Sequence, residues 1–214
     1  FIPCTDKDVP AMLAELKAII ETIQDPYLLK LLQAFFNDEA FCKTFSAAPA
    51  AMQFHHAYLG GLLEHILSVA KLAISFASHY PNIKRDLLIT GVIFHDIGKT
   101  RELSCERSFQ YTDEGLLTGH LISGVLMIQE RAAKINGFPQ DLLNVLFHLV
   151  LSHHGEYEWG SPVKPGTQEA IALHHLDNLD AKVNAAAKAI SEHKDTNSSW
   201  TEYSKMFERR LYKR

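Results

Sequence analysis

The chain has 214 residues, 47% of them hydrophobic, and a formal net charge of −4 with histidine counted as neutral. This length and apolar content allow one sizeable core and require no second domain. The negative charge argues against a generally basic nucleic-acid-binding surface but allows a local basic patch. The longest apolar runs are too short to span a membrane and no secretory signal pattern opens the chain, so we expect a soluble protein without membrane association.

The cysteines indicate a reducing compartment. Cys4, Cys42 and Cys105 are scattered, with neither the CxxC spacing of a zinc site nor the pattern of a disulfide framework. We therefore expect a cytoplasmic location and exclude a zinc site built from cysteine. Histidine, in contrast, is frequent for a chain of this length, with 12 residues.

Helical periodicity dominates the first part of the chain, and no convincing run of alternating strand residues interrupts it. Apolar residues on one face predict an amphipathic helix over residues 8–23. Asp25 and Pro26 are suited to an N-cap and a first helical residue, so we expect a second helix through Phe36. A short third helix is predicted over residues 39–45.

The middle of the chain predicts two helices and a polar segment. The first helix begins near residue 62, carries His65 in its apolar stripe and stops at Pro81. The second runs from about residue 84 to the adjacent His95 and Asp96, with Gly98 as its C-terminal stop. A loop or small hairpin is expected over residues 100–114.

The last part of the chain predicts further helices separated by turn formers. Residues 116–135 form one, and residues 139–152 form another that leads into the HHG triplet and the loop EYEWGSPVKPG. Thr167 caps a long helix through about residue 190, and Ser198 or Ser199 caps a last one that ends in ERRLYKR. The predicted fold is all-α, a single bundle of about eight or nine helices.

Several polar side chains fall where these helices should face the core. They are His65, His95, Asp96, His120, His153, His154 and Asp177. Any one of these histidines alone would more often be a hydrogen-bonded core residue. Two core-facing aspartates are harder to explain in this way, because a buried carboxylate without a partner is costly. A divalent cation would compensate all of these groups at once.

Imidazole and carboxylate without thiolate form the ligand set expected for manganese, iron, zinc and similar borderline ions. The first predicted ion is held by His65, His95, Asp96 and Asp177. A second is held by His120, His153 and His154, with Asp96 bridging. Two such ions, roughly 3.5 to 4 Å apart, would activate a water molecule and clamp a phosphate.

The order of these residues resembles the HD superfamily of metal-dependent phosphohydrolases, whose name describes the pair in GVIFHDIGK. His120 and the pair of His153 and His154 resemble its two-metal branches. A closer similarity, to the HD domain of YhaM-type 3'-to-5' exoribonucleases, lies in five ordered blocks. These blocks are APAAMQFHHAYLGGLLEH, GVIFHDIGK, LLTGHLISG, LSHHGEYEWGSP and HHLDNLDAK. The dipeptide alone is a weak signal, whereas five ordered blocks are specific.

The resemblance implies a single HD-type helical domain over residues 1–214. Its parts are N-terminal helices over 1–46, a metal-site core over 47–182 and C-terminal helices over 183–214. Full-length members of that family carry an OB-type nucleic-acid-binding module before the HD domain, and the start at Phe1 suits a fragment that lacks it. Assembly into a homo-oligomer is left open.

The resemblance also implies a reaction and a substrate. We expect phosphodiester hydrolysis that releases 3'-terminal nucleotides from single-stranded RNA, or from DNA. Two ions are expected, with manganese favoured and iron, zinc, nickel or magnesium as alternatives. The rival functions are a small-molecule nucleotide phosphohydrolase with a closed pocket, a di-iron HD oxygenase, and a non-catalytic helical binding module in which the metal only stabilises the fold.

Two residues beside the ligands are candidates for a catalytic role together with Asp96. Lys99 is expected to neutralise a phosphate oxygen, and the alternative is an ordinary lysine that complements a helix dipole. Asp180, one turn from Asp177, is expected to position a water or a ligand histidine, and the alternative is a carboxylate that faces solvent.

Candidate substrate contacts come from three further places. His55 and His56 precede a glycine pair and resemble the family's pattern. Trp159 could stack on a base, although a loop tryptophan that covers the core is as common. The basic tail ERRLYKR could contact a nucleic-acid backbone, with a solvated helix end as the alternative.

Overall fold

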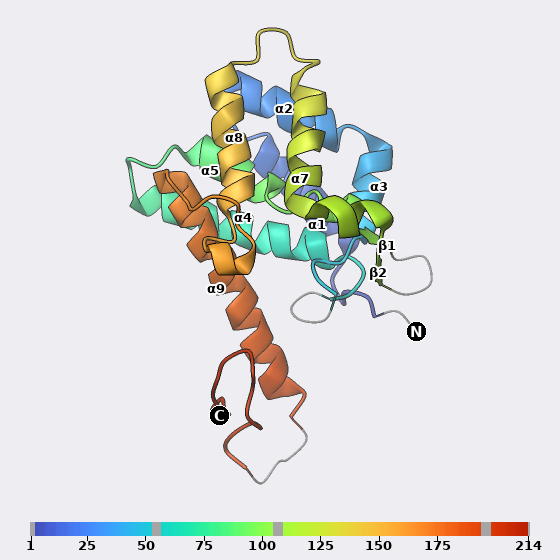
Figure 1. The fold of residues 1–214 in the computed structure, drawn as a ribbon, viewed down its shortest axis with the longest axis vertical. Helices are drawn as coiled ribbons and strands as arrows, with labels where there is room; N and C mark the ends of the chain where they lie inside the picture. The colour runs from blue at the N-terminus through green and yellow to red at the C-terminus, as the bar shows by residue number, and fades with distance from the viewer. Residues whose placement is uncertain (1–2, 53–56, 105–108, 194–197, 214) are drawn as a thin grey trace.

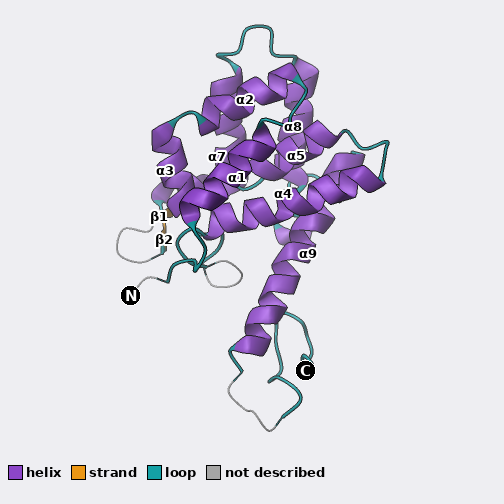
Figure 2. Cartoon of the chain, turned by 180° about the vertical axis from the view of Figure 1, so that it is seen from behind, coloured by secondary structure: helices purple, strands orange, loops and turns teal. Residues whose placement is uncertain are grey.

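The computed structural model describes residues 3–52, 57–104, 109–193 and 198–213 (Figures 1 and 2). The helices of these residues are α1 (Val9–Ile20), α2 (Pro26–Phe36), α3 (Glu39–Ala47), α4 (Gly61–His79), α5 (Arg85–Phe94), α6 (Lys99–Glu102), α7 (Asp113–Ala132), α8 (Gln140–Ser152) and α9 (Gln168–Ser191). A 3-10 turn covers Tyr157–Trp159. The strands are β1 (Leu103–Ser104) and β2 (Gln110–Tyr111), an antiparallel pair in the segment expected to hold a loop or hairpin. The all-α prediction is confirmed.

Aspartate side chains start the first three helices. The carboxylate of Asp8 accepts a hydrogen bond from the backbone N–H of residue 11, and those of Asp25 and Asp38 do the same at α2 and α3. The hydroxyl of Thr167 caps α9 in the predicted way. Each cap satisfies N–H groups that have no partner within the helix, which is why short polar residues determine where these helices begin.

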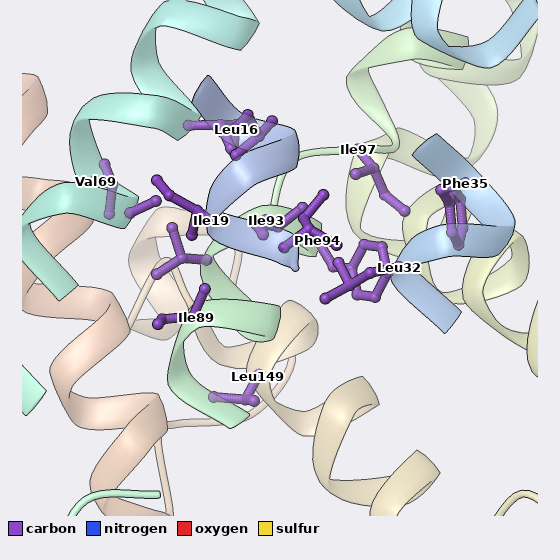
Figure 3. Packing of buried hydrophobic residues seen from close by; sticks show 14 of the residues in the cluster. Leu16, Ile19, Leu32, Phe35, Val69, Ile89, Ile93, Phe94, Ile97 and Leu149 are labelled. Carbon is purple, nitrogen blue, oxygen red and sulfur yellow. The ribbon is translucent and has the colours of Figure 1, made fainter. Parts of the chain in front are cut away.

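Helix α5 lies at the centre of the bundle. Every residue from Leu87 to Phe94 is buried, because α2, α4, α8 and α9 all pack against this helix. Figure 3 shows Ile93 and Phe94 among core side chains of neighbouring helices, and the ring of Phe94 lies 4.9 Å from that of Phe35, centroid to centroid. Because α5 is enclosed on all sides, the residues that follow it, His95 and Asp96, lie in the interior too.

Helix α4 is long and apolar enough to cross a membrane by length and composition alone. Half of its most apolar window is buried inside the domain, where α1, α3, α5 and α9 pack against it. A helix with this packing is part of the core, and its apolar stripe is accounted for by neighbouring helices.

Gly98 does not end a helix, so its predicted role as a stop is wrong. Helix α5 already ends at Phe94, and Gly98 has helical backbone angles just before α6. A Cβ atom at this position would lie 2.0 Å from the carbonyl oxygen of His120. Glycine is therefore required here because α6 and α7 approach each other closely.

The helix predicted at the C-terminal end is also wrong. Residues 199–213 instead form a hairpin, here called the C-terminal hairpin, with cross-strand backbone hydrogen bonds from Thr201 to Leu211 and from Ser204 to Arg209. The rings of Trp200 and Tyr212 meet edge to face at 5.1 Å across it. Aromatic and β-branched residues favour such cross-strand pairs, and this preference outweighs the helical pattern of the tail.

Candidate metal centre

All seven predicted ligand residues lie in one cluster, although they come from five different places in the fold. His65 lies in the first turns of α4, and His95 and Asp96 lie directly after α5. The others are His120 in α7, His153 and His154 after α8, and Asp177 in α9. His120 follows Gly119, whose positive φ of 68° kinks α7 just before it.

The carboxylate of Asp96 lies between two sets of histidines. Its Oδ2 atom is 3.3 Å from Nε2 of His95 and 3.9 Å from Nε2 of His65. Its Oδ1 atom is 3.6 Å from Nε2 of His120 and 3.7 Å from Nε2 of His153. Each oxygen thus faces its own pair of imidazoles, as a bridging carboxylate would.

Asp177 and His154 add ligand atoms to the two sets of histidines around Asp96. Oδ1 of Asp177 is 3.1 Å from Nε2 of His65 and 3.8 Å from Nε2 of His95. Among the residues that the structure describes, three groups have ligand atoms that all lie within 4.8 Å of one another. They are His65, His95 and Asp177; His95, Asp96 and His153; and His120, His153 and His154.

The donor atoms fit a divalent cation. Nε2 of His95, Oδ1 of Asp96 and Nε2 of His120 are buried and have no hydrogen-bond partner among the described residues. Leaving such groups unsatisfied costs roughly 1–3 kcal/mol each, and more for a charged group. Imidazole nitrogen and carboxylate oxygen are ligands for zinc, iron and manganese, so a cation at this place would satisfy these atoms together.

Backbone carbonyl groups orient two of the histidines. Nδ1 of His95 donates to the carbonyl oxygen of Val92, and Nδ1 of His153 donates to that of Val150, both at 2.7 Å. With the proton held on Nδ1, the Nε2 atom of each ring presents its lone pair to the pocket. Each ring donates to the carbonyl oxygen of the residue three positions earlier in the chain, so a local hydrogen bond is enough to orient it.

Carboxylates orient two further rings. Nδ1 of His65 lies 2.9 Å from Oδ2 of Asp180, whose other oxygen accepts a hydrogen bond from the hydroxyl of Ser68. Nδ1 of His120 lies 3.1 Å from Oε1 of Glu102. Asp180 is buried behind His65 rather than facing solvent. This is the arrangement in which a second carboxylate fixes the tautomer and position of a metal-binding histidine.

Ser68 and Glu102 also support the cluster, although neither is among the residues predicted from the sequence. Ser68 stands one helical turn after His65, and this spacing was the only available signal. Glu102 meets His120 only because α6 packs on α7, and no sequence pattern shows that contact. His174 donates from Nδ1 to the carbonyl oxygen of His153 and supports the backbone of that ligand.

Charges in the pocket favour the protonation states that a cation needs. Burial would raise the pKa of Asp96, but Lys99 and His95 outweigh it and hold that pKa well below its usual range. Burial also lowers the pKa of His153 well below its usual value, and neighbouring histidines lower it further. At neutral pH the carboxylate is therefore ionised and the imidazole neutral.

His65 behaves differently in the absence of a cation. Burial lowers its pKa, but hydrogen bonds with Asp177 and Asp180 raise it to about 9. The ring therefore carries a proton between two carboxylates at neutral pH. A cation that takes Nε2 as a ligand has to displace this proton.

Lys99 also interacts with Asp96. Its Nζ atom is 2.6 Å from Oδ2 of Asp96, and its side chain is 15% exposed. It lines an open cavity of about 270 Å³ beside the pocket, together with Trp159, which is 54% exposed. It also lines a second cavity, of about 470 Å³, on the side of Glu102 and Tyr111. Lys99 thus reaches solvent on both sides of the ligand cluster.

The structure brings Trp159 to the cavity but gives no view of two other candidates. His55 and His56 lie outside the described residues. A larger cavity of about 1000 Å³ lies at the N-terminal ends of α2, α5, α8 and α9 and contains none of the clustered histidines. Its carboxylates include Asp25, Asp86 and Glu169, which accept hydrogen bonds from backbone N–H groups. We therefore place the chemistry at the histidine cluster.

A sequence model of the HD domain family matches residues 62–182, which include all seven clustered residues. This chain belongs to the HD domain family. The predicted resemblance is confirmed. HD domain hydrolases bind divalent metals, and this domain contains groups of histidine and aspartate that could hold such an ion.

The chain is also similar to individual proteins of known name, all of them called 3'-5' exoribonuclease YhaM. The chain is 47% identical to the 3'-5' exoribonuclease YhaM of Bacillus licheniformis over 148 residues, which cover 69% of this chain and 47% of the relative. It is 46% identical to the protein of the same name from Bacillus subtilis, over 66% of this chain and 45% of the relative. It is 40% identical to the YhaM of a Geobacillus strain, over 85% of this chain and 55% of the relative. The chain spans about half the length of these relatives, and no solved structure matches it at a significant level.

Proposed function

We propose that this HD domain is a metal-dependent phosphohydrolase that cleaves phosphodiester bonds, acting as a 3'-to-5' exoribonuclease on single-stranded RNA. The observation that carries the proposal is the carboxylate of Asp96, which faces two sets of histidines beside an open cavity that also contains Lys99. The curated relatives named 3'-5' exoribonuclease YhaM support the choice of substrate. A cytoplasmic location remains a prediction.

The ligand residues would hold two divalent cations, with manganese favoured. The first set is His65, His95 and Asp177, the second is His120, His153 and His154, and Asp96 belongs to both. Bound divalent cations polarise phosphoryl oxygens and lower the pKa of water, which supplies a nucleophile at neutral pH. Asp180, Glu102 and two backbone carbonyls keep the imidazoles oriented, so the site is preorganised before substrate arrives.

Lys99 has a charge-balancing role in this proposal. Without a cation its ammonium group neutralises Asp96, which is 2.6 Å away. A cation bound to the carboxylate would take over this neutralisation and leave the ammonium group of Lys99 available to the cavity that it lines. Hydrolysis forms a P–O bond from water, which gives up a proton, and breaks the P–O bond to the bridging oxygen, which takes up a proton and leaves as the 3' hydroxyl of the shortened strand. The ammonium group stabilises the negative charge that grows on the phosphoryl oxygens.

The shape of the site favours a polymer over a mononucleotide. The cavity beside Asp96 opens to solvent at Trp159 and Lys182, both of which are exposed. A pocket that selects one small nucleotide would enclose it. An exposed indole beside the cavity is suited to stack on the base of a single strand.

The test is cleavage of RNA oligomers labelled at the 5' end or at the 3' end, with and without manganese. Stepwise shortening of the 5'-labelled oligomer is expected, with loss of the 3' label as a mononucleotide. The Asp96→Ala protein should be inactive, whereas Asp141→Ala, which removes an exposed carboxylate from α8, should behave as the wild type.

Other outcomes would identify the rival functions. Turnover of mononucleotides but not oligomers would indicate a small-molecule phosphohydrolase. Turnover that requires iron and oxygen and is lost with manganese would indicate an oxygenase. Bound metal without any turnover would indicate a binding module in which the cation stabilises the fold.

A further inference from the structure

We propose that the C-terminal hairpin, residues 199–213, is a single-strand-binding element that holds the nucleic-acid chain as it enters the metal centre. The proposal rests on the proposed function and adds the surface that binds the substrate away from the scissile bond. Four observations carry it: the place of the hairpin's tip, its charge, its exposed aromatic rings and its preformed backbone.

The tip of the hairpin reaches the cavity of the metal centre. Met206, between the paired residues Ser204 and Arg209, lines the same cavity as Asp96 and Asp177. Figure 1 shows this segment in dark red, turning back beside the end of α9 towards the body of the domain, and Figure 2 shows the same return from behind. A strand whose terminal phosphodiester lies at Asp96 would therefore run out past the hairpin.

The hairpin is basic in a chain that is acidic overall. Residues 199–213 contain four lysines and arginines and two glutamates, a net charge of +2, whereas the whole chain has −4. Lys205, Arg209 and Arg210 are all exposed, and none of them forms an ion pair with another described residue. Unpaired cations beside a phosphodiester site can contact the phosphates of the chain that extends from it.

Aromatic rings alternate with these charges and are exposed. Trp200, Tyr203 and Tyr212 are 49%, 60% and 55% exposed. The contact between Trp200 and Tyr212 stabilises the hairpin itself. Tyr203 makes no ring contact with the described residues, so hairpin stability does not explain its exposure. Stacking on unpaired bases is the function that combines exposed rings with neighbouring cations.

The backbone of the hairpin is held independently of these side chains. Thr201 is buried, its N–H donates to the carbonyl oxygen of Leu211, and its hydroxyl accepts from the N–H of Leu211, both at 2.9 Å. Arg209 donates from Nε to the carbonyl oxygen of Phe207, so its side chain also supports the turn. Lys205 and Arg210 make no such bond to the described residues, and they can be replaced without removing a hairpin contact.

The first experiment measures binding without turnover. The probe is a fluorescently labelled oligouridine of about 20 nucleotides, longer than typical single-strand site sizes, with calcium in place of manganese. For the Lys205→Ala/Arg210→Ala protein we expect affinity to fall about tenfold. The slope of log K against log salt should also decrease by roughly 0.7 for each cation removed. The matched control is Lys30→Ala/Lys134→Ala, which removes two exposed lysines that line none of the cavities near the metal centre.

Two further variants separate binding from folding. Lys205→Arg/Arg210→Lys keeps both charges and should restore most of the affinity, whereas a collapsed hairpin would not be rescued. Tyr203→Phe should bind as the wild type does, and Tyr203→Ala should bind about tenfold more weakly, because base stacking needs the ring and not the hydroxyl. Affinity and salt slope equal to the wild type in both alanine variants would overturn the proposal.

A second experiment distinguishes this inference from the proposed function. The ratio of kcat/KM for the long oligomer to kcat/KM for a dinucleotide should fall in Lys205→Ala/Arg210→Ala, because only the long oligomer reaches the hairpin. A wild type that binds the oligomer through the hairpin but cleaves neither substrate would refute the nuclease and leave the hairpin's role intact. A wild type that cleaves both, with the ratio unchanged in the variant, would refute the hairpin's role alone.

Discussion

The two carboxylate oxygens of Asp96 face different histidines, so this one residue connects both parts of the cluster. Its position is costly without a positive partner, because the side chain is only 3% exposed. Lys99 is such a partner, with its Nζ atom 2.6 Å from Oδ2 of Asp96, which explains how the fold tolerates the buried charge. Single-residue changes at this point should therefore affect metal binding much more than folding.

Replacing Asp96 with asparagine tests that expectation. The change keeps the volume of the side chain but removes its charge, so both cation sites should weaken and activity should fall by at least about a thousandfold. Metal content by mass spectrometry and RNA cleavage are the measurements, with Asp141→Asn as the control. Two bound ions with full activity in Asp96→Asn would contradict the bridging role.

Asp180 should act through His65 rather than on the substrate. In Asp180→Asn the ring loses the carboxylate that orients Nδ1, and metal affinity should fall about 10- to 100-fold. Excess manganese should then restore kcat with little change in KM for RNA. Ser68→Ala should show the same pattern more weakly, since Ser68 contacts only the other oxygen of Asp180. A loss of kcat that metal does not restore would instead place Asp180 at the reaction.

At the scale of elements, the close approach of α6 and α7 positions both Lys99 and His120. Gly98 allows this approach, because a side chain there would collide with the backbone at His120. Glu102 at the end of α6 then reaches the ring of His120. The contact between these two helices therefore connects a local backbone requirement to the geometry of the cluster.

Gly98→Ala should separate α6 from α7. A Cβ atom 2.0 Å from a carbonyl oxygen forces the backbone to shift, at a cost of about 1–3 kcal/mol or more. We expect a lower melting temperature and weaker binding of one of the two cations, the one near His120. Gly166→Ala is the control, because its nearest neighbour is an ordinary 3.5 Å away and its backbone is unstrained. An unchanged melting temperature in Gly98→Ala would contradict the close approach of α6 and α7 at this position.

At the scale of the whole molecule, the apolar core and the metal cluster make separate contributions. The core consists of apolar side chains from α1, α2, α3, α4, α5, α7, α8 and α9, some of which Figure 3 shows, and none of the metal-ligand candidates belongs to it. Chelation should therefore lower the melting temperature while leaving the helical circular dichroism signal unchanged. Loss of helical signal on chelation would show instead that the cation is needed for folding.

The cation-free protein should lose stability as the pH rises from about 6.5 to about 9. The pKa of His65 is raised from 6.5 to about 9 in the folded state. The folded protein therefore binds the proton of His65 more tightly than the unfolded chain does. This contribution is fully present below pH 6.5 and disappears as the pH passes 9. Melting temperatures in chelator across this range are the measurement, and His65→Gln should flatten the slope.

Manganese affinity should change in the opposite direction over the same range. The proton on His65 competes with the cation for Nε2, so affinity should increase as the pH rises towards 9. Calorimetric titration at several pH values should also show proton release on binding. Affinity that is independent of pH would indicate that His65 is not a ligand.

The sequence by itself determined the helical fold, most helix starts and the residue types of the cluster. Caps such as Asp25 and Thr167 act within one turn, and the apolar periodicity of α4 and α8 is a local property, so both are visible in the sequence. The order of His65, His95, Asp96 and Asp177 also identified the family before any geometry was known. Local interactions and ordered motifs are encoded residue by residue.

Only the tertiary structure decided which groups support that cluster and what the tail does. The contacts of Asp180 with His65 and of Glu102 with His120 join residues 115 and 18 positions apart, and packing alone determines them. A glycine that ends a helix and a glycine that allows the backbone of another helix to approach look the same in the sequence, so the role of Gly98 could not be read from its neighbours. The tail pairs with itself as a hairpin because cross-strand contacts outweigh a weak helical preference, and no local pattern shows which of the two will prevail.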